Sequence, residues 1–205
     1  MGVANYLIIA AISYLLGSLS FAIIICKLTL GQDIRTYGSG NAGLTNSYRT
    51  MGAKKTLLVL VGDIGKAAIS LAIGGMLEGT MGKLVAGIFV IVGHVFPVYF
   101  GFRGGKGVLV GATMLLFLDW RIFLIAFVLF VFAVAITKWV SLGSIIGAIS
   151  FPISMWCFYQ DTKITIVAAF MSLAVIFMHR SNIVRICKGT ENKFSFTSKP
   201  QIKKK

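Results

Sequence analysis

Long apolar runs dominate this 205-residue chain and most constrain how it can fold. Hydrophobic residues make up 57% of the sequence, and only six side chains are acidic. A helix that crosses the ~30 Å hydrocarbon layer of a bilayer needs about 20 mostly apolar residues. Candidate spans are 4–26, 56–77, 84–100, 121–137, 140–159 and 164–179. The sequence therefore predicts an all-α integral membrane protein.

A further apolar run, 108–118, is too short to cross the bilayer unaided. Loops rich in lysine and arginine stay in the cytoplasm, so the loop 27–55 and the C-terminal tail should both be cytoplasmic. If the loop 101–107 shares that side, an even number of crossings must separate it from the tail, whereas only three long runs follow it. We therefore expect about seven transmembrane helices, with 108–118 short and shielded by its neighbours. Five full spans with one re-entrant segment is the alternative.

The formal net charge of +14 would ordinarily raise nucleic acid as a partner. Here the cations lie in loops and in the tail, between segments that cannot stay in water. We expect anionic membrane lipids as partners, and no nucleic acid. Residues 1–193 are predicted to form one polytopic membrane domain, and 194–205 a basic, disordered tail. The three cysteines lack the spacing of metal ligands, so no metal site and no cofactor are predicted.

Three polar stretches interrupt the apolar runs, and each combines small or glycine residues with cations. We name them the first, second and third polar stretch: residues 38–49, 93–107 and 179–185. Backbone N–H groups beside a fixed positive charge are the parts from which anion sites are built. Phosphate-bearing substrates handled at the membrane surface are the chemistry that such parts favour.

The first polar stretch holds several hydrogen-bonding side chains and one arginine. They are Ser39, Asn41, Thr45, Asn46 and Arg49. One interpretation is a flexible turn followed by a helix cap. The other is a ligand site, because the planar fork of a guanidinium suits phosphate oxygens.

The glycine-rich part of the second polar stretch, 101–107, invites comparison with a nucleotide-binding loop. The comparison fails because Gly107 stands where a P-loop needs serine or threonine to hold magnesium. What remains is a backbone cradle of Gly104, Gly105 and Gly107 with Lys106. His94, in the same stretch, is either a hydrogen-bonded interfacial residue or a ligand. Pro97 should end or kink its helix.

Two further groups of polar residues have helical spacing. His179 and Asn182 would face the same way if the last helix continued, with Arg185 on roughly the same side. Asp63 and Lys66 lie three residues apart inside an apolar run, where ionisable groups face the protein interior. That pair is either a structural ion pair or a substrate contact.

The three stretches, in this order, resemble the motifs of the bacterial acyl-phosphate:glycerol-3-phosphate acyltransferases, the PlsY family. The family patterns are SGNxGATNxxR, GHxFPxxxxFKGGKG, and HRxNIxR followed by GxE, and the resemblance extends to about Lys193. It implies catalytic roles for Ser39, Arg49, His179 and Asn182. It also implies acyl-phosphate binding by the glycines of 101–107, and phosphate contacts by Lys106, Asn41, Thr45 and Asn46. Glu191 would support the site; we add Lys66 and Arg185 as substrate-binding residues, and Asp63 and His94 as supports.

The reaction implied by the resemblance moves a fatty acyl group from acyl phosphate to the sn-1 hydroxyl of glycerol 3-phosphate, the first acylation of phospholipid synthesis. An enzyme producing acyl phosphate would then be a functional partner, and the plasma membrane the location, with the polar stretches and tail at the cytoplasmic face. Because acyl phosphate is a reactive mixed anhydride, we expect direct transfer without an acyl-enzyme. The proton acceptor is either His179 or a substrate phosphate oxygen. A transporter for phosphorylated metabolites is the alternative function, and a membrane scaffold a third.

Overall fold

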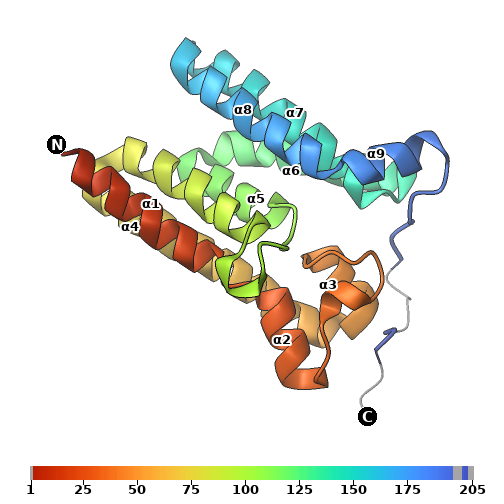
Figure 1. Ribbon diagram of the computed structural model, residues 1–205. Coiled ribbons are helices and arrows are strands. Elements are labelled where there is room, and N and C mark those ends of the chain that lie inside the picture. Colours follow the sequence, from red (N-terminus) through yellow and green to blue (C-terminus); the bar gives the residue numbers. More distant parts are fainter. Residues whose placement is uncertain (1, 196–199, 203–205) are drawn as a thin grey trace. The chain divides into compact units, whose positions relative to one another are not determined.

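The computed structural model describes residues 2–195 and 200–202, and within that part of the chain every regular element is a helix (Figure 1). Two short 3₁₀ helices accompany the α-helices: η1 (Ile34–Thr36) and η2 (Val98–Phe100). The α-helices are α1 (Val3–Gly17), α2 (Phe21–Leu30), α3 (Leu44–Met51), α4 (Ala53–Val95), α5 (Val108–Leu118), α6 (Trp120–Thr137), α7 (Val140–Tyr159), α8 (Thr162–Met178) and α9 (Arg180–Cys187).

The chain groups into two compact units. Of the described residues, the first comprises 2–118 with 200–202, and the second comprises 119–195. In the first unit α4 packs against α1, α5, α3 and α2; in the second, α7 packs against α6, α8 and α9. The single domain predicted for 1–193 stays a prediction.

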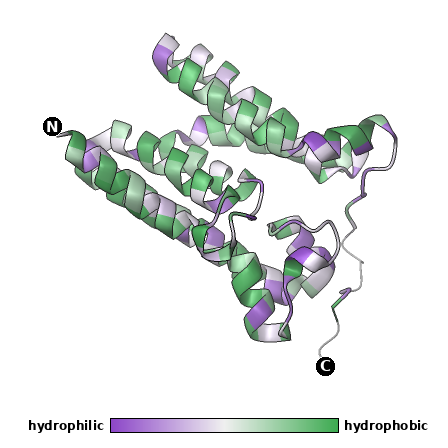
Figure 2. Ribbon diagram, in the orientation of Figure 1, coloured by the Kyte–Doolittle hydropathy of each residue, from purple (hydrophilic) through white to green (hydrophobic). Residues whose placement is uncertain are grey.

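In the part of the chain that the structure describes, four helical stretches are long and apolar enough to cross a membrane: Val3–Leu30, Ala53–Phe100, Trp120–Thr137 and Val140–Tyr159. A fifth candidate is the bent pair α8 and α9, and α5 is a shorter apolar helix. Hydrophobic residues cover most of these helices, as Figure 2 shows. The predicted all-α membrane architecture is therefore confirmed, whereas the count of seven spans stays a prediction.

The segment α4 is two helices joined by a tight reversal. Glu78 and Gly79 have non-helical backbone angles, with φ +54° at Gly79. A Cβ atom on Gly74 or on Gly82 would overlap the backbone of the other residue. Residues eight apart in a straight helix are separated by about 12 Å, so the chain must double back between them. This reversal supports two separate runs at 56–77 and 84–100, as the sequence predicts.

The first predicted span, 4–26, is broken, which corrects the expectation of one continuous helix. The helix α1 ends at Gly17 and α2 begins at Phe21. The carbonyls of Gly17 and Leu19 accept hydrogen bonds of 3.0 and 2.7 Å from the ammonium of Lys66. Because backbone groups freed by a break must be satisfied in a membrane, this distant lysine makes the break tolerable.

Close packing of α6 against α7 depends on glycine. A Cβ atom on Gly143 would lie 2.8 Å from the carbonyl oxygen of Phe130, and one on Gly147 would lie 3.3 Å from that of Ala126. Helices in lipid associate through such close approach, since burying apolar surface gives no driving force there. The small size of Gly143 and Gly147 therefore lets the two helices lie close together.

Two residues of the C-terminal tail contact α3, whereas the predicted disorder of 194–205 as a whole stays a prediction. The backbone N–H of Ile202 donates to the carbonyl of Thr50 at 3.0 Å, and that of Gln201 donates to Arg49 at 3.3 Å. These carbonyls end α3 and lack partners within that helix. The Ile202 side chain is buried in an apolar cluster that includes Ile23. Residues 196–199 and 203–205 lie outside the described residues.

We expect Ile202→Asp to lower the free energy of unfolding by about 2–3 kcal/mol, because a buried isoleucine contributes about that much. Gln201→Ala is the matched control, since the Gln201 side chain is exposed and the variant keeps the backbone donor. Thermal unfolding of the purified protein in detergent measures both. Equal stability of Ile202→Asp and the wild type would show that this segment is not docked.

Candidate active site

A buried ionic cluster of Asp63, Lys66 and His94 lies beneath the polar stretches of the first unit. The Lys66 ammonium lies 2.8 Å from the Asp63 carboxylate and 3.0 Å from Nδ1 of His94. All three side chains are at most 4% exposed. The mutual ion pair predicted from the i, i+3 spacing is therefore present.

Lys66 is enclosed by other protein groups. Its ammonium group also donates to the carbonyls of Gly17 and Leu19, so four protein groups surround it. This enclosure fits a supporting role beside Asp63 and His94, and the expected substrate contact of Lys66 stays a prediction.

The glycine loop, residues 101–107, packs directly on the end of α4, which stops at Val95 before Pro97 as predicted. Gly104 donates its N–H to the carbonyl of Val95 at 3.0 Å, and Gly105 donates to that of His94 at 3.1 Å. A Cβ atom on Gly104 would overlap the His94 carbonyl, and one on Gly105 would overlap Nε2 of His94. Only glycine at these two positions lets the loop lie this close to the end of α4.

These bonds correct part of the cradle hypothesis. The N–H groups of Gly104 and Gly105 are directed to α4 carbonyls, so the two glycines act by letting the loop pack closely. Lys106 follows them and is half-buried, and Gly107 adopts φ +79°. The loop thus presents Lys106 from a backbone that is fixed on one side.

The first polar stretch is organised by the buried side chain of Asn46. Its Oδ1 accepts from the backbone N–H of Ser39 at 2.9 Å, and its Nδ2 donates to the carbonyls of Asn41 and Tyr37 at 3.0 and 3.1 Å. Asn46 is 2% exposed, so its side chain holds the loop from inside, and its expected role as a phosphate ligand stays a prediction.

The other predicted residues of this stretch remain accessible. Ser39 is exposed, whereas Asn41, Thr45 and Arg49 are half-buried. Thr45 and Arg49 lie on α3, in its first and last turns. The two stretches also meet, since a Cβ atom on Gly105 would lie 2.9 Å from the carbonyl of Ala42. The first unit therefore gathers a serine, an arginine and a lysine around two touching loops.

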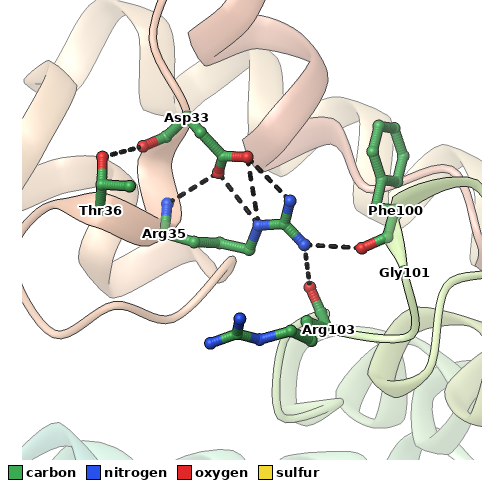
Figure 3. A pocket seen from close by; sticks show the side chains of 6 residues that line it. All are labelled: Asp33, Arg35, Thr36, Phe100, Gly101 and Arg103. Carbon is green, nitrogen blue, oxygen red and sulfur yellow. Dashed lines mark hydrogen bonds and ion pairs between the residues drawn. The ribbon is translucent and has the colours of Figure 1, made fainter.

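A pocket of about 400 Å³ opens beside the same loops. Figure 3 shows that the guanidinium of Arg35 lies between the Asp33 carboxylate and two backbone carbonyls of the second polar stretch. Neither Asp33 nor Arg35 was predicted as a site residue. The sequence pattern that could have indicated them is an acidic residue two positions before an arginine, just ahead of the first polar stretch. The lining residues are Asp33, Arg35, Thr36, Phe100, Gly101 and Arg103.

In the second unit Glu191 holds three donors from two helices. Its Oε1 accepts from Ser141 of α7 and from Asn182 of α9, each at 2.8 Å. Its Oε2 accepts from Nε of Arg185 at 2.7 Å. Burial alone would raise the pKa of Glu191, but the hydrogen bonds from Asn182, Ser141 and Arg185 outweigh it and leave that pKa below its ordinary value. Ser141 is a supporting residue that the sequence interpretation missed, because it lies 50 residues away.

His179 lies at a break between two helices, so the condition of one continuous helix through it is not met. The helix α8 ends at Met178, α9 begins at Arg180, and the two are bent by 60°. Nδ1 of His179 lies 2.8 Å from the carbonyl oxygen of Val175. Since a carbonyl only accepts, Nδ1 carries a proton and donates this hydrogen bond. The role of His179 as a proton acceptor stays a prediction.

Comparison with known proteins decides the family. The family model described as glycerol-3-phosphate acyltransferase matches residues 7–189. The chain belongs to the glycerol-3-phosphate acyltransferase family. It is therefore an acyltransferase that acts on glycerol 3-phosphate in phospholipid synthesis, built as a multi-pass membrane protein.

Named relatives are similar over nearly their whole length. The glycerol-3-phosphate acyltransferase of Thermoanaerobacter sp. (strain X514) is 41% identical over 95% of this chain and 97% of its own. Glycerol-3-phosphate acyltransferase 2 of Bacillus anthracis is 41% identical over 89% of this chain and 95% of its own. A crystal structure of the integral membrane glycerol 3-phosphate acyltransferase PlsY, in its glycerol 3-phosphate form, has a TM-score of 0.86 at 32% identity. It covers 93% of this chain and 96% of the PlsY chain.

We expect Gly105→Ala to raise the KM for the acyl donor about tenfold or more, because its Cβ atom would force the glycine loop away from His94. Gly65→Ala is the matched control, since no atom lies within 4 Å of a Cβ atom there. Steady-state kinetics with each substrate varied in turn measures the effect. An unchanged donor KM in Gly105→Ala would contradict the role of the loop.

We expect the stability difference between the wild type and Glu191→Gln to depend on pH. The folded-state pKa of Glu191 lies below its ordinary value of 4.5, so its carboxylate stabilises the fold above that pH. That stabilisation is lost as the pH falls through the lower folded-state pKa. Thermal unfolding at pH 7 should show the variant to be less stable, with the gap closing below about pH 4. A gap that is constant with pH would contradict the ionised contact.

Proposed function

We propose that this protein transfers a fatty acyl group from acyl phosphate to the sn-1 hydroxyl of glycerol 3-phosphate, forming lysophosphatidic acid and inorganic phosphate. The observation that carries the proposal is a pair of solved relatives, each covering more than nine-tenths of this chain. One is PlsY in its glycerol 3-phosphate form, and the other is PlsY in its lysophosphatidic acid form, at 30% identity and a TM-score of 0.84. These two forms are named for the acyl acceptor and the acylated product, and the donor is our inference from the motifs.

The reaction needs two anions to approach each other, so the protein must supply positive charge. In the first unit we assign Arg49 and Lys106 to the substrate phosphates, with Ser39, Asn41 and Thr45 as hydrogen-bonding partners. The guanidinium of Arg49 lies on α3, and Lys106 follows the glycines that anchor its loop. Gly107, with its positive φ, lets the chain turn from that loop into α5.

In the second unit we assign His179 and Asn182 to the catalytic step and Arg185 to substrate binding. Glu191 holds Asn182 and Arg185 in fixed positions, so these two side chains enter the reaction already oriented. The conformational entropy of these side chains is lost when the protein folds, so substrate binding does not have to order them.

The transfer is a direct displacement. The sn-1 oxygen bonds to the carbonyl carbon of acyl phosphate, the bond from that carbon to the phosphate oxygen breaks, and phosphate leaves with its electron pair. The hydroxyl proton passes to Nε2 of His179 or to an oxygen of a substrate phosphate. Donors from the protein stabilise the oxyanion that forms between these steps.

The location follows from the same chemistry, since the acceptor and the phosphate product are water-soluble anions. We propose a multi-pass protein of the plasma membrane with seven membrane helices, counting both halves of α4 and the short α5. The polar stretches and the basic tail face the cytoplasm in this proposal, because their positive charge favours that side. An enzyme that makes acyl phosphate would supply the donor.

The decisive test is conversion by the purified protein. We expect lysophosphatidic acid to form from palmitoyl phosphate and glycerol 3-phosphate, with phosphate released in equal amount. Acyl-CoA and acyl-carrier protein are offered separately as rival donors. Product formed from either rival donor, and none from acyl phosphate, would overturn the proposed donor while leaving the acceptor in place.

We expect His179→Ala to lower kcat by about 10²-fold or more if this residue accepts the proton. Arg180→Ala is the matched control, because Arg180 is the exposed neighbour and its guanidinium contacts the carbonyl and the ring of Phe177. Initial rates at saturating substrates measure kcat. A change confined to KM would leave His179 as a binding residue and transfer the acceptor role to a substrate phosphate.

A further inference from the structure

We propose that Arg35, held by Asp33, is a positioning residue that sets the glycine loop for the acyl donor. Four hydrogen bonds join Arg35 to the Asp33 carboxylate: backbone N and side-chain Nε to Oδ1, each at 3.0 Å, Nε to Oδ2 at 3.3 Å, and Nη2 to Oδ2 at 2.8 Å. The same carboxylate caps η1, so the pair is fixed to the backbone just before the first polar stretch. Nε and Nη2 of the guanidinium are thereby bound to Asp33, and Nη1 remains to contact another part of the protein.

The remaining nitrogen of the guanidinium holds the second polar stretch. Nη1 of Arg35 donates to the carbonyl of Phe100 at 2.7 Å and to that of Arg103 at 3.1 Å, as Figure 3 shows. The two carbonyls lie at the start and in the middle of the chain that leads to Lys106. Nη1 of Arg35 thus binds two carbonyls that lie 65 and 68 residues further along the sequence.

One peptide plane is held from both of its edges by this arrangement. In a trans peptide the carbonyl of Arg103 and the N–H of Gly104 point in opposite directions. The carbonyl accepts from Arg35, and the N–H donates to the carbonyl of Val95 at 3.0 Å. Rotation of this peptide would break one bond or the other, so its orientation is determined.

We call the hydrogen bonds of Arg35 to Asp33 and to the carbonyls of Phe100 and Arg103 the clamp. The clamp matters because the glycines that come after Arg103 add little stiffness to the loop. Glycine loses more conformational freedom on ordering than any other residue, and Gly104, Gly105 and Gly107 lie within four positions. Hydrogen bonds from a charged donor are about twice as strong as neutral ones. A lysine could not replace this arginine, since only the planar fork binds a carboxylate along one edge and carbonyls along the other.

The consequence for function rests on the proposed role of the glycine loop in binding acyl phosphate. Without the clamp, Lys106 would be presented from a loop that samples several conformations, and binding would have to select one of them. The donor should bind more weakly, while binding of glycerol 3-phosphate and the chemical step change little.

The test compares Arg35→Lys, Arg35→Ala and Asp33→Asn with the wild type. We expect the KM for acyl phosphate to rise about tenfold or more in Arg35→Ala, and by a smaller factor in the other two, with kcat and the KM for glycerol 3-phosphate within about threefold. Lys54→Ala removes the same charge from an exposed position of this unit and should leave every constant unchanged.

Rescue gives a readout that loss of folding would not produce. Guanidinium chloride at millimolar concentration should restore part of the donor affinity to Arg35→Ala, because the adjoining pocket is open to solvent and would admit the ion. Equal concentrations of ammonium chloride should not. If Arg35→Ala cannot be purified as one species, Arg35→Lys alone decides the question.

The outcomes separate this inference from the proposed function. If the wild type makes lysophosphatidic acid from acyl phosphate and the Arg35 variants keep the donor KM, the clamp is overturned. An equal fall in kcat for all variants, without a change in donor KM, also overturns it. If the wild type does not use acyl phosphate, the proposed donor fails instead, and the clamp is then judged by the KM for the donor that is used.

Discussion

The ammonium of Lys66 is the interaction on which the first unit depends. An ionised side chain inside a membrane helix is costly unless charge and hydrogen-bonding partners surround it. Here Asp63 supplies the opposite charge, and the carbonyls at the break between α1 and α2 supply further acceptors. His94 completes the shell and supports the glycine loop from below. One buried cation therefore links the break between α1 and α2, the two halves of α4 and the glycine loop.

Each polar stretch contains or adjoins one buried polar side chain that holds it in place. Asn46 organises the first stretch, His94 lies under the second, and Glu191 ties the third to α7. Buried polar groups with several partners specify one arrangement, because leaving any partner unpaired is costly. Several residues of the motifs thus hold the polar stretches in place, a role that residue type alone does not reveal.

The sequence predicts most where a local rule decides. Spacing placed Asp63 beside Lys66, Pro97 marked the end of α4, and apolar length located α6 and α7. It failed where a distant group decides. The break after Gly17 depends on a lysine 49 residues away, and the order of Ile202 depends on an apolar cluster of the first unit. Burial of Asn46 likewise follows from loop closure, so its role could not be read from the motif.

The six acidic side chains explain how so basic a protein leaves its site free of competing carboxylates. Each is engaged within the fold: Asp33 by Arg35, Asp63 by Lys66, Glu78 by Asn5, Asp119 by Arg121, Asp161 by the first turn of α8, and Glu191 by Arg185. A carboxylate bound by three donors, as in Glu191, has a lowered pKa and is a poor proton acceptor. Acyl transfer at neutral pH must then place the proton on an imidazole or on the substrate. In the proposed reaction, the same engagement of the acids leaves the excess of lysine and arginine to offset the charge of two phosphates, which must be brought together for transfer.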